Sequence, residues 1–254
     1  MPESPQSLAV VTGAASGIGA ATVERLAGDG FHVFALDLSA ELESVWPASA
    51  AVTPVRADVS ARPEIEDAVA AVREDGRPLR ALVNGAGRSG RSFLTEFDDE
   101  EFEALIGVNL YGVAACMRAF APDLRRAGGG AVVNVASMAA RKVDKTLGIY
   151  GAAKAGVVQL SRIAALELAR DRIRVNAVLP GPVDTAMLRA GAERLVGLRA
   201  GSVEEVLEGY RATVPLGRLG RPEELAGLIA FLVSDDASFV TGEAIGAGGG
   251  NHLS

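Results

Sequence analysis

Cysteine, histidine and aromatic residues are scarce in this chain of 254 residues, which has one cysteine, two histidines and 5% aromatic residues. The single cysteine, Cys116, excludes a disulfide within the chain and a cysteine-based metal site. Its apolar helical surroundings predict a thiol packed in the core or at an interface. His32 and His252 lie far apart and show no metal-ligand spacing. We therefore expect no metal site.

Positive charge is also in deficit, with 25 lysines and arginines against 32 aspartates and glutamates, a formal net charge of −7. Binding to nucleic acid normally requires a basic face, so we expect no nucleic-acid partner. Residues 1–6 lack the basic start and apolar stretch of a signal peptide. No uninterrupted apolar run approaches the length that crosses a bilayer. These features predict a cytoplasmic protein without membrane contact.

Seven short apolar runs alternate with longer helical patterns. The runs cover residues 8–11, 32–36, 52–57, 81–83, 131–135, 174–179 and 244–245. The helical patterns cover residues 18–27, 63–73, 98–126, 148–169 and 222–233. Short apolar runs suit strands buried on both faces of a parallel sheet, and their alternation with helices predicts an α/β fold. We expect one Rossmann domain over residues 1–254, with a doubly wound, seven-stranded parallel sheet flanked by helices and a small helical lid inserted at about residues 186–213.

A glycine-rich turn follows the first run. It reads Thr-Gly-Ala-Ala-Ser-Gly-Ile-Gly over residues 12–19, with glycines at Gly13, Gly17 and Gly19. These glycines let the backbone bend tightly and bring its N–H groups close to a pyrophosphate at the start of the next helix. The strand before the turn and the helix after it predict a dinucleotide site, which also includes Ser16 and Ile18.

Asp37 ends the second apolar run. A carboxylate at this point accepts hydrogen bonds from both hydroxyls of an adenosine ribose and repels a 2′-phosphate. No basic residue flanks Asp37, and position 16 in the glycine turn is serine instead of a basic residue. Both observations predict NAD as the cofactor in preference to NADP.

Small and polar residues follow the next two runs as well. Asp58 and Val59 follow the third run, where an adenine is expected, and Asn84, Ala86 and Gly87 follow the fourth. Because the carboxyl ends of parallel strands meet at one edge of the sheet, we expect these residues to lie along the same cofactor.

Tyr150 and Lys154 form the candidate chemical centre, and Ser137 precedes them along the chain. Residues four apart on a helix share one face. An ammonium group favours ionisation of a neighbouring phenol, so Lys154 is expected to lower the pKa of Tyr150 and make it a usable proton donor and acceptor. Ser137 is expected to hold the substrate oxygen. This spacing is also typical of surface pairs, and the predicted dinucleotide site favours the catalytic interpretation.

Together these motifs resemble the short-chain dehydrogenase/reductase family. The resemblance covers residues 8–250 and includes the glycine turn, Asp58, residues 84–87, Asn109, Ser137, Tyr150, Lys154, Pro180, Gly181, Thr185, Thr241 and Gly242. It implies that Tyr150 is the general acid or base, that Ser137 binds the substrate oxygen, and that Lys154 also binds the nicotinamide ribose. It further implies that the backbone carbonyl of Asn109 holds a water of a proton relay. Thr185 and the Val183 backbone are implied to grip the nicotinamide carboxamide, and Pro180 and Gly181 of the preceding turn to bind the cofactor as well.

The predicted function is an NAD(H)-dependent oxidoreductase that interconverts a secondary alcohol and a ketone by hydride transfer, coupled to proton transfer through Tyr150. The alternative is an NADPH-preferring reductase of 3-oxoacyl thioesters of the acyl carrier protein type. A catalytically silent nucleotide sensor or scaffold on the same fold is the alternative from a different class. Such a protein would be expected to lose Ser137, Tyr150 or Lys154, and the chain has all three.

A small-molecule alcohol or ketone is the expected substrate. Its pocket is predicted to include Ser89, Arg91, Met138, Leu147, Met187 and Leu188. The stretch over residues 141–145 is strongly charged. It is interpreted either as a solvated loop or as a rim that attracts an anionic substrate or carrier.

The helical patterns over residues 98–126 and 148–169 are more apolar than one sheet-facing stripe requires. The resemblance implies subunit contacts through these two helices, with Cys116, Val157 and Val158 among the candidate residues. We expect a homotetramer or a homodimer.

Overall fold

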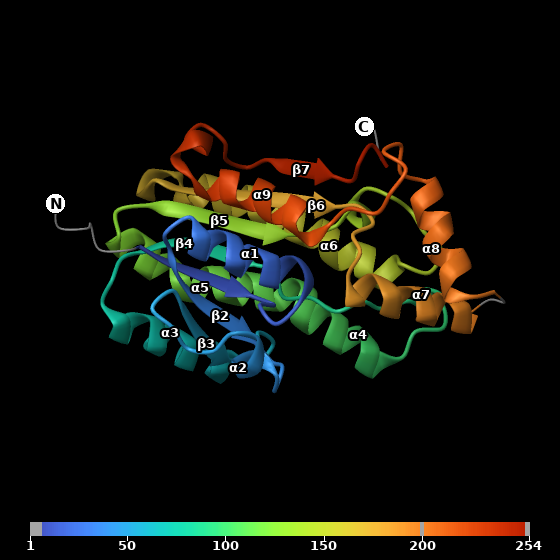
Figure 1. The fold of residues 1–254 in the computed structure, drawn as a ribbon, viewed down its shortest axis with the longest axis horizontal. Coiled ribbons are helices and arrows are strands. Elements are labelled where there is room, and N and C mark those ends of the chain that lie inside the picture. The colour runs from blue at the N-terminus through green and yellow to red at the C-terminus, as the bar shows by residue number, and fades with distance from the viewer. Residues whose placement is uncertain (1–6, 199–200, 252–254) are drawn as a thin grey trace.

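The computed structural model describes residues 7–198 and 201–251, whose strands form one seven-stranded sheet (Figure 1). The strands are β1 (Leu8–Thr12), β2 (His32–Asp37), β3 (Val52–Arg56), β4 (Leu79–Asn84), β5 (Gly130–Val135), β6 (Ile173–Pro180) and β7 (Ala244–Ala247). All neighbouring strands are parallel, in the order β3-β2-β1-β4-β5-β6-β7. The direction of winding reverses between β1 and β4, which confirms the predicted doubly wound sheet.

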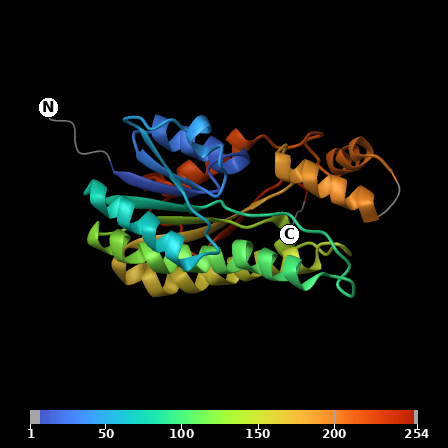
Figure 2. The ribbon, with the colours of Figure 1, turned by 90° about the horizontal axis from the view of Figure 1, so that it is seen from below.

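Helices cover both faces of the sheet (Figure 2). They are α1 (Gly17–Gly28), α2 (Leu42–Val45), α3 (Arg62–Asp75), α4 (Asp99–Ile106), α5 (Gly112–Arg126), α6 (Gly148–Leu168), α7 (Ala186–Leu198), α8 (Val203–Ala212) and α9 (Pro222–Val233). Val10 and Leu82 belong to the core shared with α3, α5 and α6, whereas Val11 and Val83 belong to the core shared with α1 and α9. Successive strand residues therefore enter different cores, which explains why the runs are apolar throughout.

The predicted helix over residues 98–126 forms, but a π-helical turn divides it. Helices α4 and α5 are joined by the turn Gly107–Tyr111, which contains the buried Asn109. Such turns interrupt the regular hydrogen-bond ladder and are frequent at functional sites. Taken as one helix of the described residues, Asp99–Arg126 is long and apolar enough to cross a membrane, but half of its apolar window is buried in the fold. Phe120 and Leu124 of this segment are fully buried in the core.

Three of the predicted subunit contacts belong to the core. Cys116, Val157 and Val158 are buried against the sheet, so they cannot meet another subunit. Burial also raises the pKa of the Cys116 thiol to about 12, as expected for a packed thiol. The exposed large apolar residues of α6 are Ile163 and Leu166, and Leu166 is 82% exposed.

The predicted lid forms two helices at the end of the molecule where the strands finish (Figure 1). Helices α7 and α8 lie between β6 and α9 in the chain and pack against each other; residues 199 and 200 between them lie outside the described residues. Ser202 and Glu205 form a reciprocal capping box at the start of α8. Arg194 of α7 pairs with Glu101 of α4, which anchors the lid to the body of the domain.

Candidate active site

One cavity of about 550 Å³ runs along the carboxyl edge of the sheet, from the glycine turn to the lid. The end of β2 and the loops that follow β1, β4, β5 and β6 contribute to its walls, together with residues of α6, α7 and α8. The carboxyl edge at the switch point is where open α/β sheets bind ligands. The cavity therefore brings together the loops predicted to hold the cofactor and to carry the chemistry.

Glycines make room at the cofactor end of the cavity. Gly13 has a left-handed backbone with φ +72°, and an added Cβ would lie 2.7 Å from the Ala86 backbone. A Cβ on Gly19 would overlap the carbonyl oxygen of Gly13. Thr12 Oγ1 accepts hydrogen bonds from the N–H groups of Gly85 and Ala86, both at 3.1 Å, which ties the two turns together. All predicted residues of the glycine turn line the cavity: Gly13, Ser16, Gly17, Ile18 and Gly19.

Asp37 lies beside the glycine turn and lines the cavity. Its Oδ2 accepts a hydrogen bond from the N–H of Ala15 at 2.9 Å, and its Oδ1 accepts one from the N–H of Ser39 at 2.9 Å. These two bonds fix the carboxylate at the end of β2. The negative charge therefore stands where an adenosine ribose is predicted.

Arg56 is a neighbour of Asp37 that the sequence did not reveal. The two residues are register partners across β2 and β3, and Arg56 Nε donates to the carbonyl of Leu38 at 3.2 Å. Strand pairing therefore brings Arg56 beside Asp37, although Arg56 does not line the cavity. Trp46 was also missed; its indole N–H donates to the carbonyl of Ala14 at 2.8 Å and supports the glycine turn.

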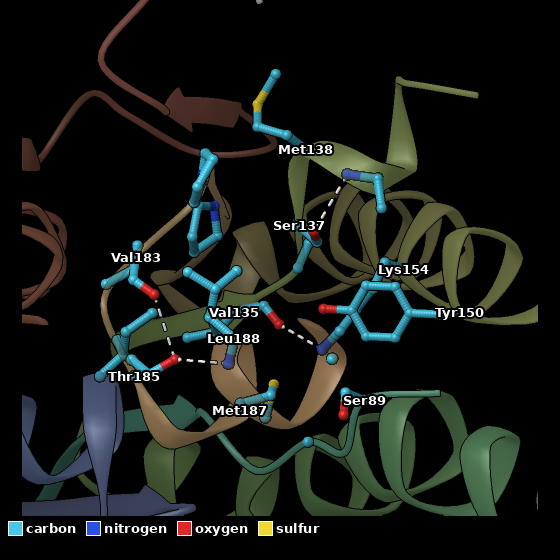
Figure 3. A pocket seen from close by; sticks show the side chains of 18 of the residues that line it. Ser89, Val135, Ser137, Met138, Tyr150, Lys154, Val183, Thr185, Met187 and Leu188 are labelled. Carbon is cyan, nitrogen blue, oxygen red and sulfur yellow. Dashed lines mark hydrogen bonds between the residues drawn. The ribbon is translucent and has the colours of Figure 1, made fainter. Parts of the chain in front are cut away.

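Tyr150, Ser137 and Lys154 face the same part of the cavity (Figure 3). Ser137 lies just after β5, and its Oγ accepts a hydrogen bond from the N–H of Ala139 at 3.1 Å. Tyr150 and Lys154 come from successive turns of α6. Lys154 is buried; its Nζ donates to the carbonyl of Val135 at 2.9 Å and lies 5.8 Å from the centroid of the Tyr150 ring. The structure thus brings the three predicted residues together.

Burial dominates the acid–base properties of this group. It raises the pKa of the Tyr150 phenol, against the hydrogen bond with Ser137 and the charge of Arg91, which both act to lower it. Burial also lowers the pKa of Lys154 to about 8. The predicted lowering of the Tyr150 pKa by Lys154 is therefore not found, because the burial that surrounds the amine also disfavours its own charged form.

Asn109 shapes the cavity wall from behind. Its Oδ1 accepts a hydrogen bond from the N–H of Arg88 at 3.2 Å, and its Nδ2 donates to the Arg88 carbonyl at 3.0 Å. A Cβ added to Gly87 would lie 3.0 Å from Asn109 Oδ1 and 3.5 Å from Lys154 Nζ. The amide therefore holds the loop after β4 close to the lysine. The relay through the backbone carbonyl of Asn109 stays a prediction.

Four residues predicted to contact the cofactor do not line the cavity: Asp58, Val59, Asn84 and Ala86. The Asp58 carboxylate accepts two hydrogen bonds from Ser60 and shapes its own turn, and Val59 packs in the core. Asn84 is buried, and its Nδ2 donates to Oδ1 of Asn134, its register partner on β5, at 2.7 Å. A polar residue at a strand end can thus serve the sheet instead of the cavity.

The loop after β6 forms the opposite wall, which includes Pro180, Gly181, Val183 and Thr185. Thr185 Oγ1 donates to the carbonyl of Val183 at 3.4 Å and accepts from the N–H of Leu188 at 3.2 Å, at the start of α7 (Figure 3). A Cβ added to Gly17 would lie 3.2 Å from Thr185 Cγ2. This loop therefore closes against the glycine turn.

The predicted substrate residues surround the remaining space. All six line the cavity: Ser89, Arg91, Met138, Leu147, Met187 and Leu188. Lining residues that the sequence did not reveal include Tyr210, Thr213 and Asn251. Asn251 accepts a hydrogen bond from Lys142 Nζ at 2.6 Å and donates to Thr213 Oγ1 at 2.7 Å. Within residues 7–198 and 201–251, no group of three or more His, Cys, Asp or Glu side chains is placed to hold a metal ion.

Known proteins resemble the whole chain. A family model described as "Enoyl-(Acyl carrier protein) reductase" matches residues 13–252. A 3-oxoacyl-[acyl-carrier-protein] reductase from Thermotoga maritima is 37% identical over 246 residues, which cover 95% of this chain and 96% of the relative. A cis-4-hydroxycyclohexanecarboxylate dehydrogenase from Sinomonas cyclohexanicum is 39% identical over 254 residues, 96% of each chain.

A crystal structure of an actinorhodin polyketide ketoreductase with NADPH matches with a TM-score of 0.91 at 36% identity, covering 97% of both chains. The fold and these relatives define an NAD(P)-dependent oxidoreductase that acts on CH–OH groups. More particularly, the chain belongs to the short-chain dehydrogenase/reductase family.

Proposed function

We propose that the protein interconverts a secondary alcohol and a ketone with NAD(H). The observation that carries this proposal is the meeting of Tyr150, Ser137 and Lys154 in one cavity with the glycine turn and Asp37. A proton-transfer group and a dinucleotide cradle in one space are what hydride transfer to a carbonyl carbon requires. Each of them alone also has structural explanations.

The residues present fit a nicotinamide dinucleotide. The absence of Cβ atoms at Gly13 and Gly19 lets the backbone at the start of α1 approach a pyrophosphate. The nicotinamide, when bound, supplies or accepts the hydride. Thr185 would bind its carboxamide. Lys154 donates one of its three N–H bonds to Val135, and the others are available to the neighbouring ribose.

Tyr150 is the proton donor to the ketone oxygen in reduction and the acceptor in oxidation. Its raised pKa keeps the phenol protonated at neutral pH, which is the form that reduction needs. Ser137 Oγ accepts from Ala139 and shares a hydrogen bond with Tyr150. Its hydroxyl would donate to the substrate oxygen in the complex and stabilise the charge that develops there. Lys154 and a water on the Asn109 carbonyl form the route by which the phenol regains its proton.

Asp37 supports NAD over NADP, because its carboxylate repels a 2′-phosphate. A second candidate function is the reduction of 3-oxoacyl thioesters with NADPH. The names of the Thermotoga and polyketide relatives favour it, and so does Arg56, a cation beside the predicted ribose position.

Titration with NADH and NADPH, followed by assays on secondary alcohols, ketones and 3-oxoacyl thioesters, tests the two candidates together. We expect NADH to bind at least about tenfold tighter, which corresponds to about 1.4 kcal/mol. Tighter NADPH binding with selective turnover of thioesters would establish the second candidate. Failure to bind either nucleotide would exclude both.

A further inference from the structure

Arg91 is a buried cation in the substrate part of the cavity. Its side chain is 7% exposed and lines the cavity together with Tyr150. Its charge acts on the phenol, so the guanidinium and the proposed proton donor face the same space. A buried charge costs free energy unless a counter-charge or several hydrogen bonds compensate for it.

The contacts of Arg91 with the protein are mainly neutral. Its two terminal nitrogens donate to Thr146 Oγ1 and to the hydroxyl of Tyr210, both at 2.6 Å. Asp144 approaches to 3.6 Å, but it is 37% exposed and already accepts the N–H and hydroxyl protons of Thr146. The positive charge of Arg91 is therefore only partly neutralised.

The surroundings of Arg91 favour an anion. Tyr210 also lines the cavity, and because its oxygen accepts from Arg91, its own proton is directed elsewhere. Lys142 lines the same region, and its Nζ donates to the neutral amide of Asn251. This wall thus carries two cations against the single carboxylate of Asp144.

We propose that Arg91 and Tyr210 bind a carboxylate of the substrate, which makes the substrate a hydroxy acid or the corresponding oxo acid. This inference rests on the proposed function, since the carbinol carbon must lie at Tyr150. A guanidinium binds a carboxylate through two parallel N–H bonds, and the Tyr210 hydroxyl supplies a third. The apolar side chains of Met138, Leu147 and Met187 suit the hydrocarbon between the two groups.

The burial of Arg91 distinguishes a substrate carboxylate from the phosphate of a carrier arm. Arg91 lies inside the cavity with the proton donor, whereas a carrier phosphate sits at the far end of a long flexible arm. Such a phosphate would meet the exposed rim residues Arg141 and Lys145 instead. Arg91→Gln abolishes the preference for acids on the present proposal, whereas binding of a carrier phosphate would depend on Arg141 and Lys145.

Matched pairs of substrates test the proposal. Hydroxy acids from 3-hydroxybutyrate to 4-hydroxycyclohexanecarboxylate are compared with their methyl esters in NAD-dependent oxidation. We expect the best acid to exceed its ester at least about tenfold in kcat/KM, mostly through KM, because a charge-assisted pair is lost in the ester. Arg91→Gln is expected to remove that preference, so that acid and ester have similar kcat/KM values in the variant, and Arg91→Lys to restore part of it. Equal use of acid and ester by the unmodified protein would overturn the proposal.

A binding measurement separates this inference from the proposed reaction. Calorimetry on the protein–NADH complex compares cyclohexanecarboxylate with cyclohexanecarboxamide and needs no turnover. If the acid binds about tenfold tighter than the amide, and Arg91→Gln loses this difference, the carboxylate site at Arg91 is supported even where no alcohol is oxidised. Equal affinities contradict it. NADH affinity and the thermal midpoint report whether Arg91→Gln folds. If it does not fold, Tyr210→Phe replaces it, with a smaller loss of acid affinity expected.

Discussion

The substitution Asp37→Asn removes the negative charge at the ribose end of the cavity and keeps the size of the side chain. The amide oxygen can still accept the N–H of Ser39 or of Ala15, but not both. We expect this change to shift the cofactor preference from NADH towards NADPH. The reason is that the carboxylate is proposed both to accept the ribose hydroxyls and to repel a 2′-phosphate.

The size of the shift follows from these two effects. Replacing a charged acceptor with a neutral one weakens binding of the ribose hydroxyls by about 1–2 kcal/mol. Removing a unit charge at about 5 Å from a phosphate relieves about 3 kcal/mol at an effective dielectric constant of about 20, which solvent and salt reduce to about 1–2 kcal/mol near the surface. The sum, about 2–4 kcal/mol, corresponds to a change of about 30- to 1000-fold in the NADH-to-NADPH ratio of kcat/KM.

The assay is initial-rate kinetics with each nucleotide, together with fluorescence titration of NADH and NADPH. Asp58→Asn is the matched control, because Asp58 also lies at the carboxyl edge of the sheet, just after β3, but does not line the cavity. It should leave the ratio within about twofold. Adding Arg56→Gln to Asp37→Asn should reduce the gain in NADPH affinity, since Arg56 is the register partner of Asp37 across β2 and β3. An unchanged ratio in Asp37→Asn would refute the assignment of Asp37 to the ribose.

Three further outcomes are expected. Because the pKa of Tyr150 is raised, the phenolate that oxidation needs becomes more abundant as the pH increases. The kcat/KM for oxidation at saturating NAD should therefore rise from pH 7 to 9 without a plateau. A plateau at pH 7 would show that the bound cofactor and substrate lower this pKa. Asn109→Ala leaves the backbone N–H and carbonyl of Arg88 without their partner. It should lower the free energy of unfolding by about 1–3 kcal/mol in a denaturant titration. An unchanged midpoint would show that the Asn109 side chain does not hold the loop after β4. Leu166→Glu places a charge on the most exposed apolar residue of α6. The predicted homotetramer or homodimer is expected to form through this helix, so the variant should show a lower mass in light scattering. An unchanged mass would place the subunit contact on another element.

The order of strands and helices could be predicted because each strand of the parallel sheet is buried on both faces. Val10 and Val11 enter opposite cores, so their run is apolar without alternation. The glycine turn was readable for a similar reason, since at Gly13 and Gly19 any side chain would meet the backbone. Local sequence carries such constraints directly.

Contacts made by strand pairing and by distant loops could not be predicted in this way. Arg56 lies beside Asp37 in the sheet only because β2 and β3 pair in register. In the same way, the register of β4 and β5 pairs Asn84 with Asn134, and their side chains hydrogen-bond to each other instead of lining the cavity. Asn251 meets Lys142 across more than a hundred positions of sequence, and neither residue lies in a periodic pattern.

Acid–base properties were the least predictable part of the site. Spacing alone indicated that Lys154 would lower the pKa of Tyr150. The structure shows that burial acts on both groups, raising the pKa of the phenol and lowering that of the amine. Which effect dominates depends on how deeply the two side chains are buried, and the sequence does not contain that quantity.

The central claim is that Tyr150 transfers the proton during hydride transfer. Tyr150→Phe tests it through the single-turnover rate of NADH oxidation with a reducible ketone, with Tyr111→Phe, on the exposed face of the π-turn, as the control. We predict that Tyr150→Phe binds NADH within about threefold of the unmodified protein and loses about 10²- to 10⁴-fold in rate. The control should keep its rate. A rate for Tyr150→Phe within about tenfold of the unmodified protein would contradict the account.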